Sequence, residues 1–159
     1  MIDAEKILLP ELLTTLLHQE ETLQFSRFSS DTALQLGLGI VEAAKLAHQS
    51  VLVEIRFGDL QLFQHAMEGC NPDNVDWVRR KVNVVRRFAR SSFYMGTLYR
   101  SKGTDFDTAT GLDPREYAAH GGAFPLRIRG AGMVGVVTVS GLPQAEDHAL
   151  AVAVLRTMV

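Results

Sequence analysis

FPLRIRGAGMVGVVTVS, at residues 124–140, is the stretch that most strongly predicts the fold of this chain. Two largely apolar runs, Phe124–Arg129 and Met133–Ser140, lie on either side of a glycine-rich turn at residues 130–132. Apolar runs of this length joined by a short turn that contains glycine are typical of a β-hairpin. Since the two strands of a hairpin are antiparallel, the stretch predicts an antiparallel sheet rather than a doubly wound parallel one.

Three more segments are expected to be strands of the same sheet. The turn Gly58-Asp59 joins Val51–Phe57 to Leu60–Ala66, which predicts a second hairpin. Thr22–Phe28 alternates enough between apolar and polar residues to be a fifth strand. Because the helical segments are grouped between the hairpins, the sequence predicts the α+β class, with five largely antiparallel strands flanked by helices.

Five helices are expected around this sheet. The first 20 residues have leucines at helical spacing and predict an N-terminal helical arm, with Pro10 near its start or at a kink. Residues 101–119 are polar, contain two glycines and a proline, and are expected to form a long surface loop. The other helices are expected from caps at Ser29–Asp31 to His48, from Asn71–Asp73 to about Arg90, over Phe93–Arg100, and from Leu142-Pro143 to Val159.

Composition excludes several classes of protein. A length of 159 residues with 47% hydrophobic residues predicts one domain, residues 1–159, whose core needs no disulfide or metal. The single cysteine, Cys70, has no CxxC or Cys/His partners, so a reducing cytoplasm is expected and a metal site is not. No apolar run reaches the roughly 18 residues of a membrane span. The N-terminus does not resemble a secretory signal, and a net charge of -2 gives no field that would attract nucleic acid.

The helix expected from Asn71 places one lysine where its period predicts an apolar residue. Lys81 lies between Trp77 and Val85 on the apolar arc, where it must find a partner, extend to solvent or line a cleft. Two interpretations stay open: its ammonium meets a carboxylate at a subunit edge, or it binds an anion in a pocket. A Schiff-base lysine would need a carbonyl chemistry that nothing else in the sequence identifies.

The opposite arc of that helix is rich in arginine and is expected to be a solvated surface. Binding of nucleic acid and ion pairs between subunits are the alternatives. No RNA-binding motif and no interleaved aromatic residues accompany the arginines, so nucleic acid is not an expected partner.

A second candidate for a binding site is the segment HGGAFPL, residues 120–126. Gly121 and Gly122 allow backbone angles and close approaches that other residues do not, so the segment is either a binding loop or a tight entry into a strand. Backbone amides at this pair, together with His120 and the Lys81 ammonium, would favour a small anion such as a carboxylate or phosphate.

The start of the last helix adds Asp147 and His148. An aspartate there complements the positive helix end and can simply be a capping residue, whereas a histidine near that end tends to stay neutral. Ser92 would fall three turns beyond Lys81 on nearly the same line if the long helix continued. The expected ligand-binding set is therefore Lys81, Ser92, His120, Gly121, Gly122, Asp147 and His148, with no catalytic residue and no metal ligand assigned.

Four motifs, taken in order, resemble those of a known family. They are DNVDWVRRK at 73–81, RSS at 90–92, HGGAFPL at 120–126 and GMVGVVTVSGLPQAEDHALA at 132–151. Over essentially the whole chain, the sequence is similar to the haem-degrading-domain-like superfamily and in particular to its uncharacterised protein family 0303 branch. The resemblance implies a profilin-like, five-stranded antiparallel sheet and a homo-oligomer of several subunits. It implies no catalytic residues and marks no Cys or His as a haem ligand.

Three kinds of function are compatible with these residues. The first is a cytoplasmic, oligomeric protein that binds a small anionic or cofactor-like molecule in a cleft and holds no haem. The second is an interaction or assembly module, for which the arm at Leu8–Leu17 would supply a partner helix. The third is an enzyme that uses Lys81 or His148, although no nucleophile and base pair is identifiable. The leucine arm and the apolar end at Val159 predict a homo-oligomer larger than a dimer.

Overall fold

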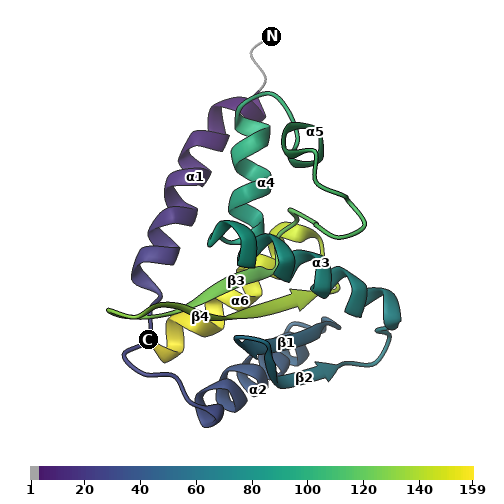
Figure 1. Cartoon of the computed structure of the whole chain (residues 1–159). Helices are drawn as coiled ribbons and strands as arrows, with labels where there is room; N and C mark the ends of the chain where they lie inside the picture. The colour runs from purple at the N-terminus through teal and green to yellow at the C-terminus, as the bar shows by residue number, and fades with distance from the viewer. Residues whose placement is uncertain (1–3) are drawn as a thin grey trace.

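The structure, a computed structural model, describes residues 4–159, with side chains from Leu8 onward. It confirms the α+β class: in this part of the chain, helices cover both faces of one sheet (Figure 1). The elements are α1 (Ala4–Thr22), α2 (Ser30–Leu46), β1 (Leu52–Phe57), β2 (Leu60–Ala66), α3 (Pro72–Phe88), α4 (Ser92–Ser101), α5 (Phe106–Thr110), β3 (Ala123–Ile128), β4 (Gly132–Ser140) and α6 (Gln144–Met158).

The sheet has four strands in the order β2-β1-β4-β3, and every pair of neighbours is antiparallel. Both predicted hairpins are confirmed, β1 with β2 and β3 with β4. They join through their inner strands, where Leu52 of β1 lies opposite Ser140 of β4. This register places the end of β4 and the start of β1 together, beside the point where the chain turns into α6.

The fifth strand expected at Thr22–Phe28 is wrong. α1 continues through residue 22, and only Phe25 pairs with the sheet, by one isolated parallel bridge to Ile128. Two backbone hydrogen bonds of 2.8 and 2.9 Å to the residues on either side of Ile128 make this bridge. Because Ser29 already caps the next helix, too few residues remain between the two helices for a longer ladder.

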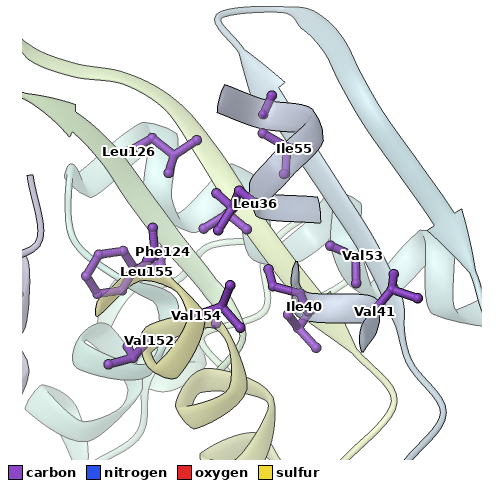
Figure 2. Close-up of a cluster of buried hydrophobic side chains, with 14 of the residues drawn as sticks. Leu36, Ile40, Val41, Val53, Ile55, Phe124, Leu126, Val152, Val154 and Leu155 are labelled. Atoms are coloured by element: carbon purple, nitrogen blue, oxygen red, sulfur yellow. The ribbon is translucent and has the colours of Figure 1, made fainter. Parts of the chain in front are cut away.

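One face of the sheet is covered by α2 and α6, and this layer holds the larger part of the core (Figures 1 and 2). α2 starts at the cap predicted from the sequence: Ser29 accepts a hydrogen bond from the Thr32 N–H, and Thr32 bonds back to Ser29. The side chains labelled in Figure 2 come from both helices and from β1 and β3. Those labelled are Leu36, Ile40, Val41, Val53, Ile55, Phe124, Leu126, Val152, Val154 and Leu155.

The other face of the sheet is covered by α3. Asn71 caps the helix with Pro72 in its first turn, as expected, and the helix ends at Ala89, whose φ of 53° is left-handed. Val78, Val82 and Val85 of α3 pack against Leu52 and Val136 of the sheet. The apolar arc predicted for this helix therefore faces the sheet.

α1 and α4 stand side by side and extend the molecule away from the sheet (Figure 1). The predicted arm is thus a helix that packs on its own chain: Leu16 is buried, whereas Leu8 is 60% exposed. The loop expected at 101–119 contains the short helix α5, which buries Phe106 against α3 and α4. Among the helices of the described residues, none has the length and apolar character needed to cross a membrane.

Candidate functional site

The first turns of α3 and α6 border one cavity of about 380 Å³ at the end of β4. Three of the residues expected to bind a ligand line it: Lys81 from α3, His120 from the loop before β3, and Asp147 from α6. The remaining lining residues are Asn71, Asp73, Asn74, Trp77, Ser140, Gly141, Leu142 and Gln144.

Lys81 and Asp147 form the floor of this cavity. The Lys81 Nζ lies 3.1 Å from Oδ2 of Asp147 and donates a second hydrogen bond, also of 3.1 Å, to the carbonyl of Val139. The other carboxylate oxygen of Asp147 accepts the N–H of Leu142 at 2.9 Å. Lys81 thus has a carboxylate partner within its own chain and also lines a cavity.

Burial acts against both charges of this pair. Burial lowers the pKa of Lys81 and raises the pKa of Asp147, and the ion pair opposes both shifts. An ammonium has three N–H donors, and its contacts with Asp147 and Val139 use two of them. Among the described residues, the third donor has no hydrogen-bond partner.

Gly121 and Gly122 bring the chain close behind this ion pair. At Gly122, φ is +136°, and a Cβ would lie 2.3 Å from the carbonyl oxygen of Val139 and 2.8 Å from the Lys81 Nζ. The N–H of Gly121 donates to the side-chain oxygen of Gln144 at 3.1 Å. The two glycines therefore serve the close approach of backbone to β4 and α6, and the Gly121 amide is already bonded.

Trp77 and His120 form one wall of the cavity. Their rings meet edge to face with centroids 5.3 Å apart, and the Arg80 guanidinium lies 4.1 Å from the centre of the Trp77 ring. Partial burial and the Lys81 ammonium lower the pKa of His120, so its imidazole is neutral at physiological pH. This wall presents an aromatic surface and a neutral hydrogen-bonding group.

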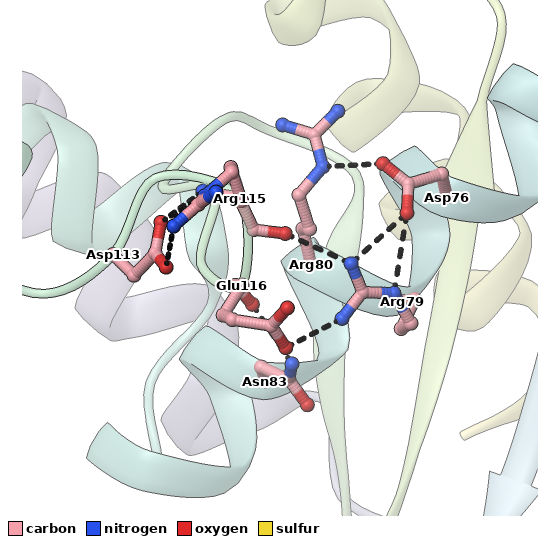
Figure 3. Close-up of polar contacts among 7 residues, drawn as sticks. All are labelled: Asp76, Arg79, Arg80, Asn83, Asp113, Arg115 and Glu116. Atoms are coloured by element: carbon pink, nitrogen blue, oxygen red, sulfur yellow. Dashed lines mark hydrogen bonds and ion pairs between the residues drawn. The ribbon is translucent and has the colours of Figure 1, made fainter.

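The loop before β3 is fastened to the arginine-rich surface of α3 (Figure 3). Arg79 forms an ion pair of 2.7 Å with Glu116, and the amide of Asn83 donates to the Glu116 carbonyl at 2.8 Å. Arg79 also pairs with Asp76 on its own helix. Part of the predicted solvated arc is thus occupied in holding the segment that leads to His120.

Two expected site residues lie elsewhere. Ser92 is buried, and its Oγ bonds the N–H and the carbonyl of Ala123 at 3.1 and 3.4 Å, which fixes the start of β3. His148 is buried beside the rings of Phe93 and Phe124, and its Nε2 lies 2.7 Å from Oε1 of Gln19 on α1. Neither residue lines the cavity that contains Lys81.

The sequence does not single out Asn74 or Gln144 as ligand-binding residues, and it places Trp77 on the apolar arc of its helix rather than in the expected binding set. Asn74, Trp77 and Lys81 are three and then four residues apart, so they lie on one face of α3. That spacing could have identified Asn74 and Trp77 as neighbours of Lys81 on the same helix face. Gln144 had no such signal, because its place beside Gly121 depends on how α6 meets β3.

The chain is similar to known proteins over most of its length. A family model described as haem degrading protein HbpS-like matches residues 28–156. The UPF0303 protein of Streptomyces avermitilis is 48% identical over 147 residues, which cover 92% of this chain and 90% of that protein. A UPF0303 protein of Edwardsiella ictaluri is 46% identical over 88% of this chain and 89% of its own. The chain therefore belongs to the HbpS-like family and, within it, to the UPF0303 proteins.

Solved structures show the same fold. The crystal structure of the Ybr137w protein superposes with a TM-score of 0.84 at 33% identity, over 99% of this chain and 96% of that one. HbpS gives a TM-score of 0.65 at 19% identity, over 86% and 93%. A PduOC:heme complex gives 0.68 at 16% identity, over 81% and 93%. At these lower identities, the last two establish the fold alone.

The family name refers to haem. Haem iron needs an axial side chain whose coordinating atom is free and lies beside an apolar pocket. His148 faces an apolar groove, but its Nε2 is bonded to Gln19 and its Nδ1 is buried within the protein. His120 lines a cavity whose walls are mostly polar. Neither of these two histidines fits the role of an axial haem ligand.

Proposed function

We propose that the chain binds a small anionic or cofactor-like molecule in the cavity between the first turns of α3 and α6. The observation that carries the proposal is the buried ammonium of Lys81, which lines the cavity with one N–H donor left over. A cavity of about 380 Å³ is within the size range of small-molecule sites.

The start of α6 supports an anionic group on the ligand. Pro143 precedes the helix, and no side chain caps it, so N–H groups of its first turn keep free hydrogen-bonding capacity. Free N–H groups at a helix N-terminus attract anions. Lys81 reinforces that field from the floor of the same cavity.

The carboxylates of the cavity restrict what kind of anion fits. Asp147 balances the charge of Lys81, and Asp73 adds a negative charge at the rim. A ligand that carries only negative charge would therefore gain little binding free energy in this cavity. A ligand that also carries hydroxyl or amino donors would in addition form hydrogen bonds to the Asp73 carboxylate.

Trp77 supplies the experiment, because it is the only tryptophan in the sequence and it lines the cavity. We expect its fluorescence to change on titration with phosphate, malonate or hydroxymalonate, and hydroxymalonate to bind more tightly than malonate. Lys81→Met alone would leave Asp147 buried and unpaired. The double variant Lys81→Met/Asp147→Asn avoids this and should weaken binding by about tenfold or more, as expected for a lost charge-assisted hydrogen bond.

His65→Gln is the matched control for His120→Gln, since His65 is exposed on β2, away from the cavity. Only the change at His120 should weaken binding. Native mass spectrometry of protein purified from its host would identify a co-purified small molecule. If none of the three anions changes the Trp77 signal and no small molecule co-purifies, the proposal fails.

A second candidate function, assembly into a homo-oligomer larger than a dimer, rests on exposed leucines. Leu34, Leu38 and Leu46 lie along the outer side of α2 and are 48%, 55% and 76% exposed. Exposed apolar side chains gathered on one helix are typical of surfaces that bind another protein chain. We expect light scattering at micromolar concentration to show the oligomer and Leu34→Ser/Leu38→Ser to dissociate it. A monomeric wild-type protein would exclude this function.

A further inference from the structure

A second hollow, which shares no lining residue with the Lys81 cavity, lies between α1 and α6. α1 packs along α4, and α4 touches α6, but α1 and α6 do not pack against each other along their length. An open groove of about 510 Å³ remains between them.

The walls of this groove are apolar. Leu12 and Leu16 of α1, Phe93 of α4 and Val152 of α6 form its sides. The floor is a row of small side chains on α6, in which Ala145, Ala149 and Ala153 follow one another at every fourth residue and are exposed. Small side chains in the floor leave room for a guest between the two helices.

The polar groups of the groove are hydrogen-bond donors or neutral. His148 bonds Oε1 of Gln19, which leaves the amide nitrogen of Gln19 as a donor at the wall. Arg156 is the one charged side chain in the lining, and it forms no ion pair with any carboxylate that the structure describes. Between His148 and Arg156, α6 rises about 12 Å, so the groove is elongated.

We propose that this groove binds a free aliphatic carboxylate, with its hydrocarbon chain on the leucine and alanine walls and its carboxylate at Arg156. Charge complementarity selects this occupant: the lining has one cation, no anion, the neutral polar side chains of Gln19 and His148, and otherwise apolar walls. A carboxylate would give the Arg156 guanidinium the bidentate partner that its geometry favours. The site is independent of the cavity at Lys81.

The proposal is tested by titration calorimetry with octanoate and decanoate, each below its micelle concentration. Two added methylene groups should tighten binding by about tenfold if the chain lies on apolar walls. Arg156→Gln should weaken decanoate binding by about tenfold, because a charge-assisted hydrogen bond is lost. Arg129→Gln, an exposed arginine in the β3–β4 turn, is the matched control and should leave it unchanged.

Ala149→Leu tests the place of binding without endangering the fold. Position 149 is exposed on a helix, and leucine is a good helix former, so the melting temperature should be kept while decanoate binding is lost. Equal affinity of octan-1-ol and octanoate would overturn the proposal, because the charge would then not be recognised. It would also be overturned if Ala149→Leu dissociates an oligomer and decanoate does not bind, since a second copy of the chain would then occupy the groove.

Discussion

Lys81 and Asp147 are 66 residues apart in the chain, yet they form an ion pair of 3.1 Å in which both side chains are almost fully buried. The pair joins the middle of α3 to the first turn of α6 across the end of β4. There the carbonyl of Val139 accepts a second hydrogen bond from the Lys81 ammonium. It therefore holds together the two helices that border the cavity.

The energetics of this pair give the first prediction. Lys81→Met or Asp147→Asn alone should lower the free energy of unfolding by about 3–5 kcal/mol, because each leaves one buried charge without a partner. The double variant should lose clearly less than the sum of the two, as measured by urea denaturation. Additive losses would show that the two groups do not interact.

His148 gives a prediction about pH. Burial lowers the pKa of His148 to about 4, whereas an unfolded histidine takes up its proton near pH 6.5. The unfolded state therefore binds the proton first as the pH falls, so this contribution to stability is complete above about pH 6.5 and is lost toward pH 4. The loss amounts to about 3 kcal/mol.

The measurement is the free energy of unfolding at several pH values between 7 and 4, for wild type and His148→Gln. Carboxylates titrate in the same range, so the difference between the two proteins isolates the imidazole. His65→Gln, exposed on β2, should follow the wild-type curve. Parallel curves for wild type and His148→Gln would refute the assignment.

Gly122 provides a third prediction. Gly122→Ala combines a strained φ of +136° with a Cβ placed 2.3 Å from the Val139 oxygen, so it should cost about 3 kcal/mol of stability. Gly103→Ala has a positive φ of +79° but open space around the Cβ, and should cost only about 1 kcal/mol. Thermal melts of both variants test the difference, and an equal loss would mean that the close approach at residue 122 is unimportant.

Haem binding is the subject of the fourth prediction. Both ring nitrogens of His148 are inaccessible to iron, because one is bonded to Gln19 and the other is buried, and His120 lies in a polar cavity. The purified protein should therefore be colourless even when it is expressed with ample haem. Absorption spectroscopy checks this directly. A Soret band at one haem per chain would contradict it.

The sequence predicted the elements whose signals are local. The hairpin turn at residues 130–132 and the caps at Ser29 and Asn71 are formed by neighbouring residues, so they could be recognised without the rest of the fold. The strand at Thr22–Phe28 failed because α1 runs through residue 22 and Ser29 caps the next helix, which leaves too few residues to pair along the free edge of β3. The burial of Phe106 in α5 depended on contacts with α3 and α4.

The candidate site could be predicted only in part. The helical period singled out Lys81, but its partner Asp147 comes from a helix 66 residues further on, and no local pattern connects them. The separation of Asp147 from His148 could have been predicted from the sequence. Asp147 and His148 are consecutive on a helix, so their side chains point about 100° apart, and one faces the cavity while the other faces the groove.

The attachment of Glu116 to α3 makes the cavity sensitive to the ionic strength of its surroundings. The ion pair of Arg79 with Glu116 is about half exposed and is weakened by salt, whereas the buried pair of Lys81 with Asp147 is shielded from it. Salt would therefore loosen the segment that ends at His120 while the floor of the cavity keeps its shape. Residues on the outer surface that do not line the cavity thus set how firmly one of its walls is held.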